Sequence, residues 1–357
     1  MTTRPTGGNP ADRVAVHLVK RPEGVPALDC FAIVSSPVPE PAAGQLLVRS
    51  RMVSVDPSMR GRMNGTESYV AGYGLNSVVA GRALGEIVAA GPGTGGFRVG
   101  DTVVHWGGWQ DWAVVDAAAT LPVPAIPGLA DELWLGALGA PGLTAYIGVR
   151  AIGRVQPGDS VYVSAAAGGV GSIAGQLARA YGAGRVLGSA GSSGKASHLL
   201  RDLGFGGAFD YKQIRVTQAL DELAPDGIDV YFDNVGGDHL AEVLPHKNNG
   251  GRIVACGAIS QYNGEAQRES PDLTAIITKR LRFEGFIVGD HADRRGEFIE
   301  EVAPMLLDGR VRAEVTVFDG IERAPEAFLA MFRGETNGKT LVRCCPRAAP
   351  RAGYLTS

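Results

Sequence analysis

A glycine-rich turn between an apolar run and an amphipathic segment carries the clearest chemical signal in this sequence. Residues 160–164 form the apolar run, Ala166, Gly168 and Gly171 give the spacing A-x-G-x-x-G, and residues 172–181 have a helical pattern. Glycines in such a turn let backbone N–H groups approach phosphates, and the helix N-terminus that follows supplies partial positive charge. With a further strand predicted at 185–189, the turn predicts a site for a dinucleotide pyrophosphate.

The segment about 20 residues beyond the first glycine distinguishes between the two nicotinamide nucleotides. A site that prefers NAD(H) places an acidic residue there to bind the ribose 2′-hydroxyl. Residues 189–195 contain serines and end at Lys195, but they contain no acid. Hydroxyl and ammonium groups would hold a 2′-phosphate, which a carboxylate would repel. We therefore expect NADP(H) to be preferred over NAD(H).

Composition narrows the class of protein. The chain has 357 residues, enough for about two domains, and 45% of them are hydrophobic and 20% charged. A net charge of −3 without long charge runs argues against nucleic acid as the main partner. Four scattered cysteines do not make a disulfide framework, and no apolar stretch approaches membrane-spanning length. We expect a cytoplasmic protein without a membrane partner.

The rhythm of the sequence changes near residue 160. Before it, short apolar runs separated by Gly and Pro predict a β-rich, barrel-like region, followed by a helical stretch from Asp131 through Tyr146. After it, strands predicted at 161–164, 185–189, 207–211, 228–233, 252–257 and 281–288 alternate with predicted helices. Such alternation specifies an α/β fold with a doubly wound parallel sheet. A last strand at 339–344 is expected to rejoin the N-terminal region, because six strands already complete that sheet.

Six segments together resemble the zinc-free, NADPH-dependent alkenal/one reductases of the medium-chain dehydrogenase/reductase superfamily, which include prostaglandin reductases and plant double-bond reductases. The segments are 56–63, 108–112, 139–146, 165–171, 232–237 and 256–263. The resemblance implies a GroES-like partial barrel over residues 1–133, rejoined by 313–357, and a Rossmann NADP-binding domain over 134–312. It also implies reduction of the C=C bond of α,β-unsaturated aldehydes or ketones.

The resemblance further implies roles for individual residues. The pyrophosphate and the 2′-phosphate end of NADP(H) would be held by Gly168, Gly169, Val170, Gly171, Lys195 and Tyr211. The ribose and nicotinamide would be lined by Asn234, Cys256, Gly257, Ala258, Ile259, Ser260, Phe286, Ile287 and Val288. Tyr262 would lie at the active centre as the catalytic residue.

Two departures from the family pattern affect the predicted site. The family has Tyr after Asp-Pro in its first motif, whereas this chain has Ser58, so substrate shape or polarity is expected to differ. The family motif Gly-x-Asn-x-Gly-Lys appears here with Thr336 at the Asn position and Asn337 one place later. Asn337 is kept as a candidate cofactor contact. Candidates for the substrate pocket are Ser58, Arg60 and Trp109, although Trp109 could equally belong to the core of the β-rich region.

The residues predict chemistry without a metal. Residues 81–85 lack the Gly-His-Glu signature of the zinc branch, no cysteine lies between residues 31 and 255, and the histidines show no ligand spacing. Without a Lewis acid, hydride attack on the β-carbon of an enone is the easier reaction, because the charge that develops on the enolate oxygen needs only hydrogen-bond donors. The Tyr262 hydroxyl is the candidate donor; its other interpretation is a ring packed in a loop.

Alternatives to the alkenal/one reductase hypothesis stay open. The same scaffold could reduce quinones, or serve as a specialised biosynthetic reductase for a bulky unsaturated intermediate that Ser58 would accommodate. A cofactor-binding regulator without catalysis is less consistent with retention of both the turn and Tyr262. A homodimer is expected, because the apolar run 281–288 could form a sheet edge that a partner would cover.

Overall fold

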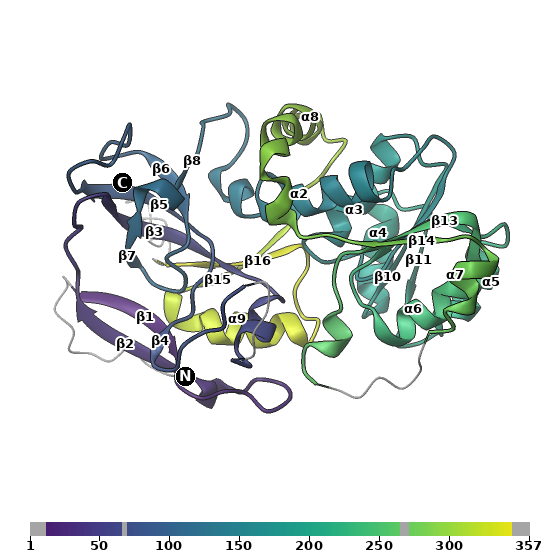
Figure 1. The fold of residues 1–357 in the computed structure, drawn as a ribbon, viewed down its shortest axis with the longest axis horizontal. Coiled ribbons are helices and arrows are strands. Elements are labelled where there is room, and N and C mark those ends of the chain that lie inside the picture. Colours follow the sequence, from purple (N-terminus) through teal and green to yellow (C-terminus); the bar gives the residue numbers. More distant parts are fainter. Residues whose placement is uncertain (1–11, 66–69, 265–270, 345–357) are drawn as a thin grey trace, which may run out of the picture.

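Two lobes lie side by side along the long axis of the computed structural model (Figure 1), which describes residues 12–65, 70–264 and 271–344. The lobe that carries the glycine-rich turn contains a six-stranded sheet, all of whose pairings are parallel. Its order is β11-β10-β9-β12-β13-β14. The strands are β9 (Ser160–Val163), β10 (Arg185–Ala190), β11 (Gly207–Asp210), β12 (Ile228–Asp233), β13 (Lys247–Ala255) and β14 (Arg282–Gly285). The strand order reverses between β9 and β12, where ligands of such sheets bind beyond the strand carboxyl ends.

Helices cover both faces of this sheet because successive strand residues point to opposite sides. Val161 and Val163 face a core shared with α2 (Ala140–Ile147), α3 (Gly171–Ala180), α4 (Ser193–Arg201) and α8 (Arg295–Leu307). Tyr162 and Tyr231 face the opposite core, with α5 (Val216–Leu223), α6 (Gly237–Val243) and α7 (Thr274–Thr278). This is the doubly wound arrangement expected from the alternation of strands and helices.

The second lobe is mainly antiparallel and receives the end of the chain. A three-stranded sheet has the order β2-β1-β4, and a seven-stranded sheet has the order β15-β16-β3-β5-β6-β8, with β7 also paired to β3. The expected return of the last strand is confirmed, because β16 pairs antiparallel with β3. Helix α1 (Met59–Arg62) follows β3, and α9 (Ala324–Phe332) precedes β16. The strands are β1 (Asp12–Leu18), β2 (Phe31–Pro37), β3 (Gln45–Val55), β4 (Ser77–Val78), β5 (Ala83–Ala90), β6 (Thr102–His105), β7 (Trp112–Asp116), β8 (Leu121–Pro122), β15 (Val315–Asp319) and β16 (Lys339–Arg343).

Two predicted elements differ from the structure. The helical stretch expected from Asp131 through Tyr146 is a 3-10 turn over Asp131–Leu135 and then α2. The chain breaks between them because Gly139 lies against the Trp134 carbonyl, where a Cβ atom would clash. The strand expected over 281–288 ends at Gly285, since β14 pairs only with residues 252–255 of β13. Within the described ranges, no helix is long and apolar enough to cross a membrane.

We propose that the protein forms a homodimer through the edge strand β14. Phe283 on this strand is 47% exposed, and Ile277 on the neighbouring α7 is 77% exposed. Light scattering at micromolar concentration should give the mass of two chains, because a partner would cover this apolar edge. Phe283→Asp should shift the mass toward one chain, whereas Val315→Asp, at a 37% exposed position on the edge strand β15, should not. A single-chain mass for the unaltered protein would refute the proposal.

Candidate functional site

The turn between β9 and α3 has a backbone shape that depends on one of its glycines. A Cβ atom on Gly171 would lie 2.5 Å from the Ala165 carbonyl oxygen and 2.9 Å from Ala166 Cα. At Gly169, by contrast, the nearest atoms would lie 3.4 Å away or more. Ala165 itself has a φ of +48°, a conformation that non-glycine residues rarely adopt. The fold therefore requires Gly171, whereas a Cβ atom on Gly168 would meet only the Ala165 carbonyl oxygen, at 3.3 Å.

Lys195 lies in the first turn of α4, after β10, and Tyr211 directly follows β11 and donates its N–H to the Ala190 carbonyl at the end of β10. The Ser192 hydroxyl accepts a hydrogen bond from the Lys195 N–H, which caps α4. A Cβ atom on Gly191 would lie 3.3 Å from the Tyr211 hydroxyl and 3.4 Å from Lys212 Cε. Burial and, next, repulsion from Lys212 lower the pKa of Lys195. Two ammonium groups and a phenol at this end fit a 2′-phosphate.

Sequence reasoning missed Lys212, although it directly follows Tyr211. The nearby acid, Asp210, is fixed by two hydrogen bonds. Its two carboxylate oxygens accept hydrogen bonds from the Ser193 hydroxyl (3.2 Å) and from the Lys212 N–H (3.0 Å). The Asp210 carboxylate is thus held by the first turn of α4 and by the chain after β11.

The segment before β16 passes along the glycine-rich turn. The Gly338 N–H donates to the Ala167 carbonyl (2.9 Å), and the Thr336 carbonyl accepts from Lys195 Nζ (2.6 Å). Thr336 is buried, whereas Asn337 is exposed and both its backbone groups bond the Thr316 hydroxyl. The structure therefore places Thr336 next to Lys195 and bonds the Asn337 backbone to Thr316, while Asn337 stays a predicted cofactor contact.

Asn234, Gly257 and Tyr262 meet at the carboxyl edge of the sheet. The Asn234 N–H donates to the Ser164 hydroxyl (3.0 Å), and its side-chain amide donates to the Ser164 carbonyl (2.8 Å). A Cβ atom on Gly257 would lie 3.2 Å from the Asn234 carbonyl oxygen and 3.6 Å from the Tyr262 hydroxyl. The Tyr262 hydroxyl therefore lies near the strand end where Asn234 emerges.

The neighbouring Asp233 shapes this edge rather than contacting a ligand. Its Oδ1 accepts hydrogen bonds from the Tyr231 hydroxyl (2.7 Å) and from the N–H groups of Val235 (2.9 Å) and Gly236 (2.8 Å). The Ser260 hydroxyl donates to the Val235 carbonyl (2.6 Å) and so joins the 3-10 turn Ile259–Gln261 to the same loop. Asp233 is a buried turn former.

The remaining residues predicted near the nicotinamide differ in exposure. Burial raises the pKa of Cys256 to about 12, so it is a neutral packing residue and not a nucleophile. Phe286 and Val288 pack against the same core as Cys256, whereas Ile287 is 38% exposed. Ala258 contacts the Val235–Gly237 turn, because a Cβ atom on Gly236 would lie 3.3 Å from the Ala258 Cβ atom.

Arg60 connects the two lobes beside Tyr262. Its side chain is buried and donates to the Gly24 carbonyl (2.6 Å), to Asn64 and, through Nε, to Asn263 Oδ1 (3.2 Å). These bonds hold the loop that carries Tyr262 against the β-rich lobe. Arg60 is thus a positioning residue. Ser58, two residues earlier, is exposed.

The prediction that Trp109 lines the substrate pocket is wrong. The ring is fully buried in the core of the β-rich lobe, 5.8 Å from the rings of Phe31 and Phe328. Its indole N–H donates to the Ser54 carbonyl (2.9 Å), which satisfies the polar group. The alternative interpretation, a core tryptophan, is the correct one.

An ion pair joins β16 to the residue that follows β3, within the β-rich lobe. Lys339 Nζ lies 2.7 Å from Asp56 Oδ1 and donates to the Val55 carbonyl (2.6 Å), while the Ser54 hydroxyl donates to Asp56 Oδ2 (2.5 Å). Burial alone would raise the pKa of Asp56, but the Lys339 ammonium, the Ser54 hydrogen bond and the Arg82 charge together leave that pKa lowered. A Cβ atom on Gly169 would lie 3.4 Å from Lys339 Cα. The pair therefore sits beside the glycine-rich turn.

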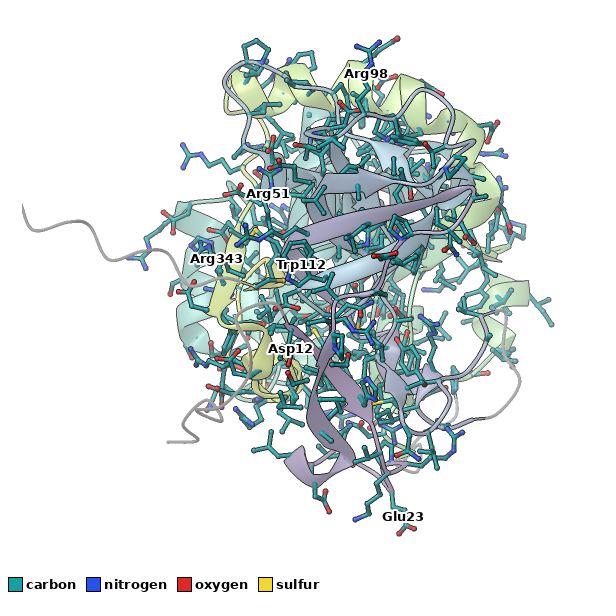
Figure 2. All side chains as sticks on the ribbon, turned by 90° about the vertical axis from the view of Figure 1, so that its left-hand side faces the viewer. Asp12, Glu23, Arg51, Arg98, Trp112 and Arg343 are labelled. Carbon is teal, nitrogen blue, oxygen red and sulfur yellow. The ribbon has the colours of Figure 1, made fainter. Side chains whose placement is uncertain are left out.

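Two further features bear on the choice of site. Across the part of the chain that the structure describes, no group of three His, Cys, Asp or Glu could hold a metal ion. A groove lined by Arg51, Met52, Leu84, Asp131 and Arg343 contains none of the predicted site residues. Arg51 and Arg343 appear together in the view onto the end of the β-rich lobe (Figure 2).

Comparison with known proteins agrees with this geometry. Residues 15–123 match the family described as N-terminal domain of oxidoreductase, and residues 169–306 match the family described as zinc-binding dehydrogenase. The chain is 33% identical to NADPH-dependent curcumin reductase of Escherichia coli over 91% of its length and 95% of that protein. It is 38% identical to 2-alkenal reductase of Nicotiana tabacum, over 85% and 86%, and 38% identical to mouse prostaglandin reductase 1, over 91% and 97%.

The chain belongs to the medium-chain dehydrogenase/reductase family. A solved structure of CurA from Vibrio vulnificus in complex with NADPH is 36% identical, with a TM-score of 0.87 over 95% of this chain and 100% of that one. The protein is an NADP-dependent oxidoreductase, and its open turn and its Lys195–Lys212 pair fit that cofactor. Although one matching family is described as zinc-binding, the described residues of this oxidoreductase provide no such ligand group.

Lys195→Ala in this oxidoreductase should weaken NADPH binding about 10- to 150-fold while changing NADH binding little. A hydrogen bond to a charged group contributes about 1.5–3 kcal/mol, and only NADPH carries the 2′-phosphate. Fluorescence titration of both cofactors measures the effect. Lys20→Ala, an exposed lysine paired with Asp29 in the other lobe, is the matched control. Equal losses of affinity for NADPH and NADH would show that Lys195 does not bind the 2′-phosphate.

Proposed function

We propose that this oxidoreductase reduces the C=C bond of α,β-unsaturated aldehydes or ketones, with hydride added to the β-carbon. The observation that carries the proposal is the Tyr262 hydroxyl, which faces Gly257 and Asn234 at the carboxyl edge of the sheet. Relatives named curcumin reductase, 2-alkenal reductase and prostaglandin reductase support this class of substrate.

Different residues of the chain would hold different parts of the cofactor. The backbone of the turn over Gly168–Gly171 would hold the pyrophosphate, while Lys195, Tyr211 and Lys212 would hold the 2′-phosphate. When bound, NADPH supplies the hydride. The Asn234 carbonyl and the 256–260 segment would line the nicotinamide side, beside Tyr262.

Tyr262 acts on the substrate oxygen. As the β-carbon accepts hydride, negative charge moves to the carbonyl oxygen, and the phenolic O–H donates a hydrogen bond to it. The hydroxyl is effective because its loop is held in place: Arg60 bonds Asn263, the next residue, and the Ser260 hydroxyl bonds the Val235 carbonyl. A donor that is already oriented does not have to reorganise as the charge develops.

Quinone reduction is the main alternative, but no specific feature of the structure favours it. A solved quinone oxidoreductase of Escherichia coli in complex with NADPH is 22% identical with a TM-score of 0.74, a likeness that concerns the fold alone. A reductase for a bulky biosynthetic intermediate would carry out the same chemistry at Tyr262. A panel of enones and quinones with NADPH separates these possibilities by their relative rates.

Tyr262→Phe should lower the maximal rate with an enone about 10²- to 10³-fold, the usual effect of removing one oxyanion donor. NADPH affinity should change little, because the cofactor is held mainly at its phosphates. Steady-state kinetics and cofactor titration measure both quantities. Tyr181→Phe, which removes a hydroxyl bonded to Glu301 on the far side of α3, is the control. Full activity of Tyr262→Phe would exclude this residue from the mechanism.

A further inference from the structure

The His198 side chain on α4 lies between two carboxylates. Its Nδ1 atom is 2.5 Å from Asp202 Oδ2, one turn further along the chain, and its Nε2 atom is 2.7 Å from the Glu314 carboxylate. Glu314 directly precedes β15 of the β-rich lobe. The imidazole ring therefore joins α4 to a segment that lies 116 residues further along the chain.

This geometry specifies the charged form of the ring. A carboxylate only accepts hydrogen bonds, a neutral imidazole has one N–H donor, and an imidazolium has two. Both contacts of His198 can therefore be hydrogen bonds only when the ring carries its second proton. In the neutral form, the lone pair of one ring nitrogen would face a carboxylate oxygen, and that contact would be lost.

The charges around His198 agree with this assignment. Burial lowers the pKa of the ring, but the hydrogen bonds and charges of Glu314 and Asp202 outweigh that effect and leave the pKa raised. The Arg312 guanidinium donates to the Asp202 carbonyl (3.3 Å), and Lys195 lies one turn earlier on α4. Because the folded pKa is raised, the ring stabilises the fold fully below about pH 6.5, and this contribution is lost as the pH rises through the folded pKa.

Glu314 supports the segment that passes along the cofactor turn. Its carbonyl accepts a hydrogen bond from the Lys339 N–H (2.8 Å). A Cβ atom on Gly338 would lie only 2.6 Å from the Glu314 Cβ atom, so the two residues are in close contact. The Gly338 N–H donates in turn to Ala167 of the cofactor turn (2.9 Å). A displacement of Glu314 would therefore move the segment over residues 336–339.

Lys195 is the second contact between α4 and this segment. Its Nζ atom donates to the Thr336 carbonyl (2.6 Å). Lys195 and His198 are three residues apart on the helix, so they lie on neighbouring turns of one face. The helix thus holds residues 336–339 directly through Lys195 and indirectly through His198 and Glu314. The contact of His198 with Glu314 helps to fix the carbonyl that orients the Lys195 ammonium.

We propose that His198 is a positioning residue for NADPH, which as an imidazolium holds α4 against Glu314 and so keeps Lys195 oriented toward the 2′-phosphate. The proposal rests on Lys195 as the ligand of that phosphate, and it does not depend on which substrate is reduced. When the ring loses its proton, one of its two bonds is lost and NADPH binding weakens. NADH lacks the 2′-phosphate, so its affinity should change little.

The test is fluorescence titration with NADPH and with NADH between about pH 6.5 and about pH 9, on either side of the raised pKa. The dissociation constant for NADPH should rise about 2- to 12-fold across this range, the equivalent of one hydrogen bond. The rise should follow the pKa of the His198 ring, measured by nuclear magnetic resonance. His198→Gln should bind NADPH weakly at every pH and lose the rise.

Glu314→Gln distinguishes positioning through the proton from a general structural role. Its side-chain amide can donate to the neutral ring nitrogen, so the contact with His198 no longer needs the second proton. This variant should bind NADPH tightly across the whole range. His246→Gln is the control, since that ring bonds the Thr217 hydroxyl at the start of α5, and it should keep the rise.

Three results would overturn the proposal. The first is a rise of the same size in His198→Gln, which would assign it to Lys195 or to the phosphate itself. The second is an equal loss of affinity for NADPH and NADH in His198→Gln, and the third is weak NADPH binding by Glu314→Gln at every pH. Because no enone enters these titrations, a failure to reduce enones would refute the proposed function alone.

Discussion

The passage of residues 336–339 between the lobes is the constraint on which the site depends. Within four residues, Thr336 accepts from Lys195, Gly338 donates to Ala167 of the cofactor turn, and Lys339 pairs with Asp56. Gly338 has a φ of +61°, and a Cβ atom there would clash with the Glu314 carbonyl, so only glycine fits. The chain then enters β16 and pairs with β3 of the other lobe. One short segment thereby sets the position of the cofactor turn relative to the substrate side.

The ion pair at the end of this segment joins the start of β16 to the end of β3. Removing one partner of a buried pair typically costs about 3–5 kcal/mol, because the other charge is left without compensation. The Asp56 side chain is 28% exposed and that of Lys339 only 5%, so the cost falls mainly on an unpaired lysine. The Arg82 guanidinium also helps to lower the pKa of Asp56, so the carboxylate interacts favourably with both cations.

The parts of the fold that depend on local sequence patterns could be predicted from the sequence. The six parallel strands, the glycine-rich turn and the return of the last strand follow from apolar periodicity and turn residues. Trp109 could not be assigned in this way, because only packing distinguishes a core tryptophan from one that lines a pocket. The break before α2 also escaped prediction, since it depends on how closely Gly139 approaches Trp134.

In the predicted site, too, some residues are indicated by their local sequence and others depend on distant neighbours. Lys195, Tyr211 and Asn234 lie at strand ends or a helix start, where their sequence context is informative, and Tyr262 follows the 3-10 turn Ile259–Gln261. Lys212 matters because of Lys195, a neighbour that is distant in the sequence. Asn337 is a candidate through a motif in which it is shifted by one residue, and its backbone bonds the Thr316 hydroxyl.

The fate of an isotope label tests the proposed reaction most directly. The enzyme would be incubated with an enone and NADPH that is deuterated at the transferred position of C4, and the product examined by nuclear magnetic resonance. If hydride adds to the β-carbon, the deuterium of NADPH will appear on the β-carbon. In D₂O, deuterium from the solvent will appear on the α-carbon. Deuterium on a carbinol carbon would mean that the carbonyl group is reduced instead, which would contradict the account.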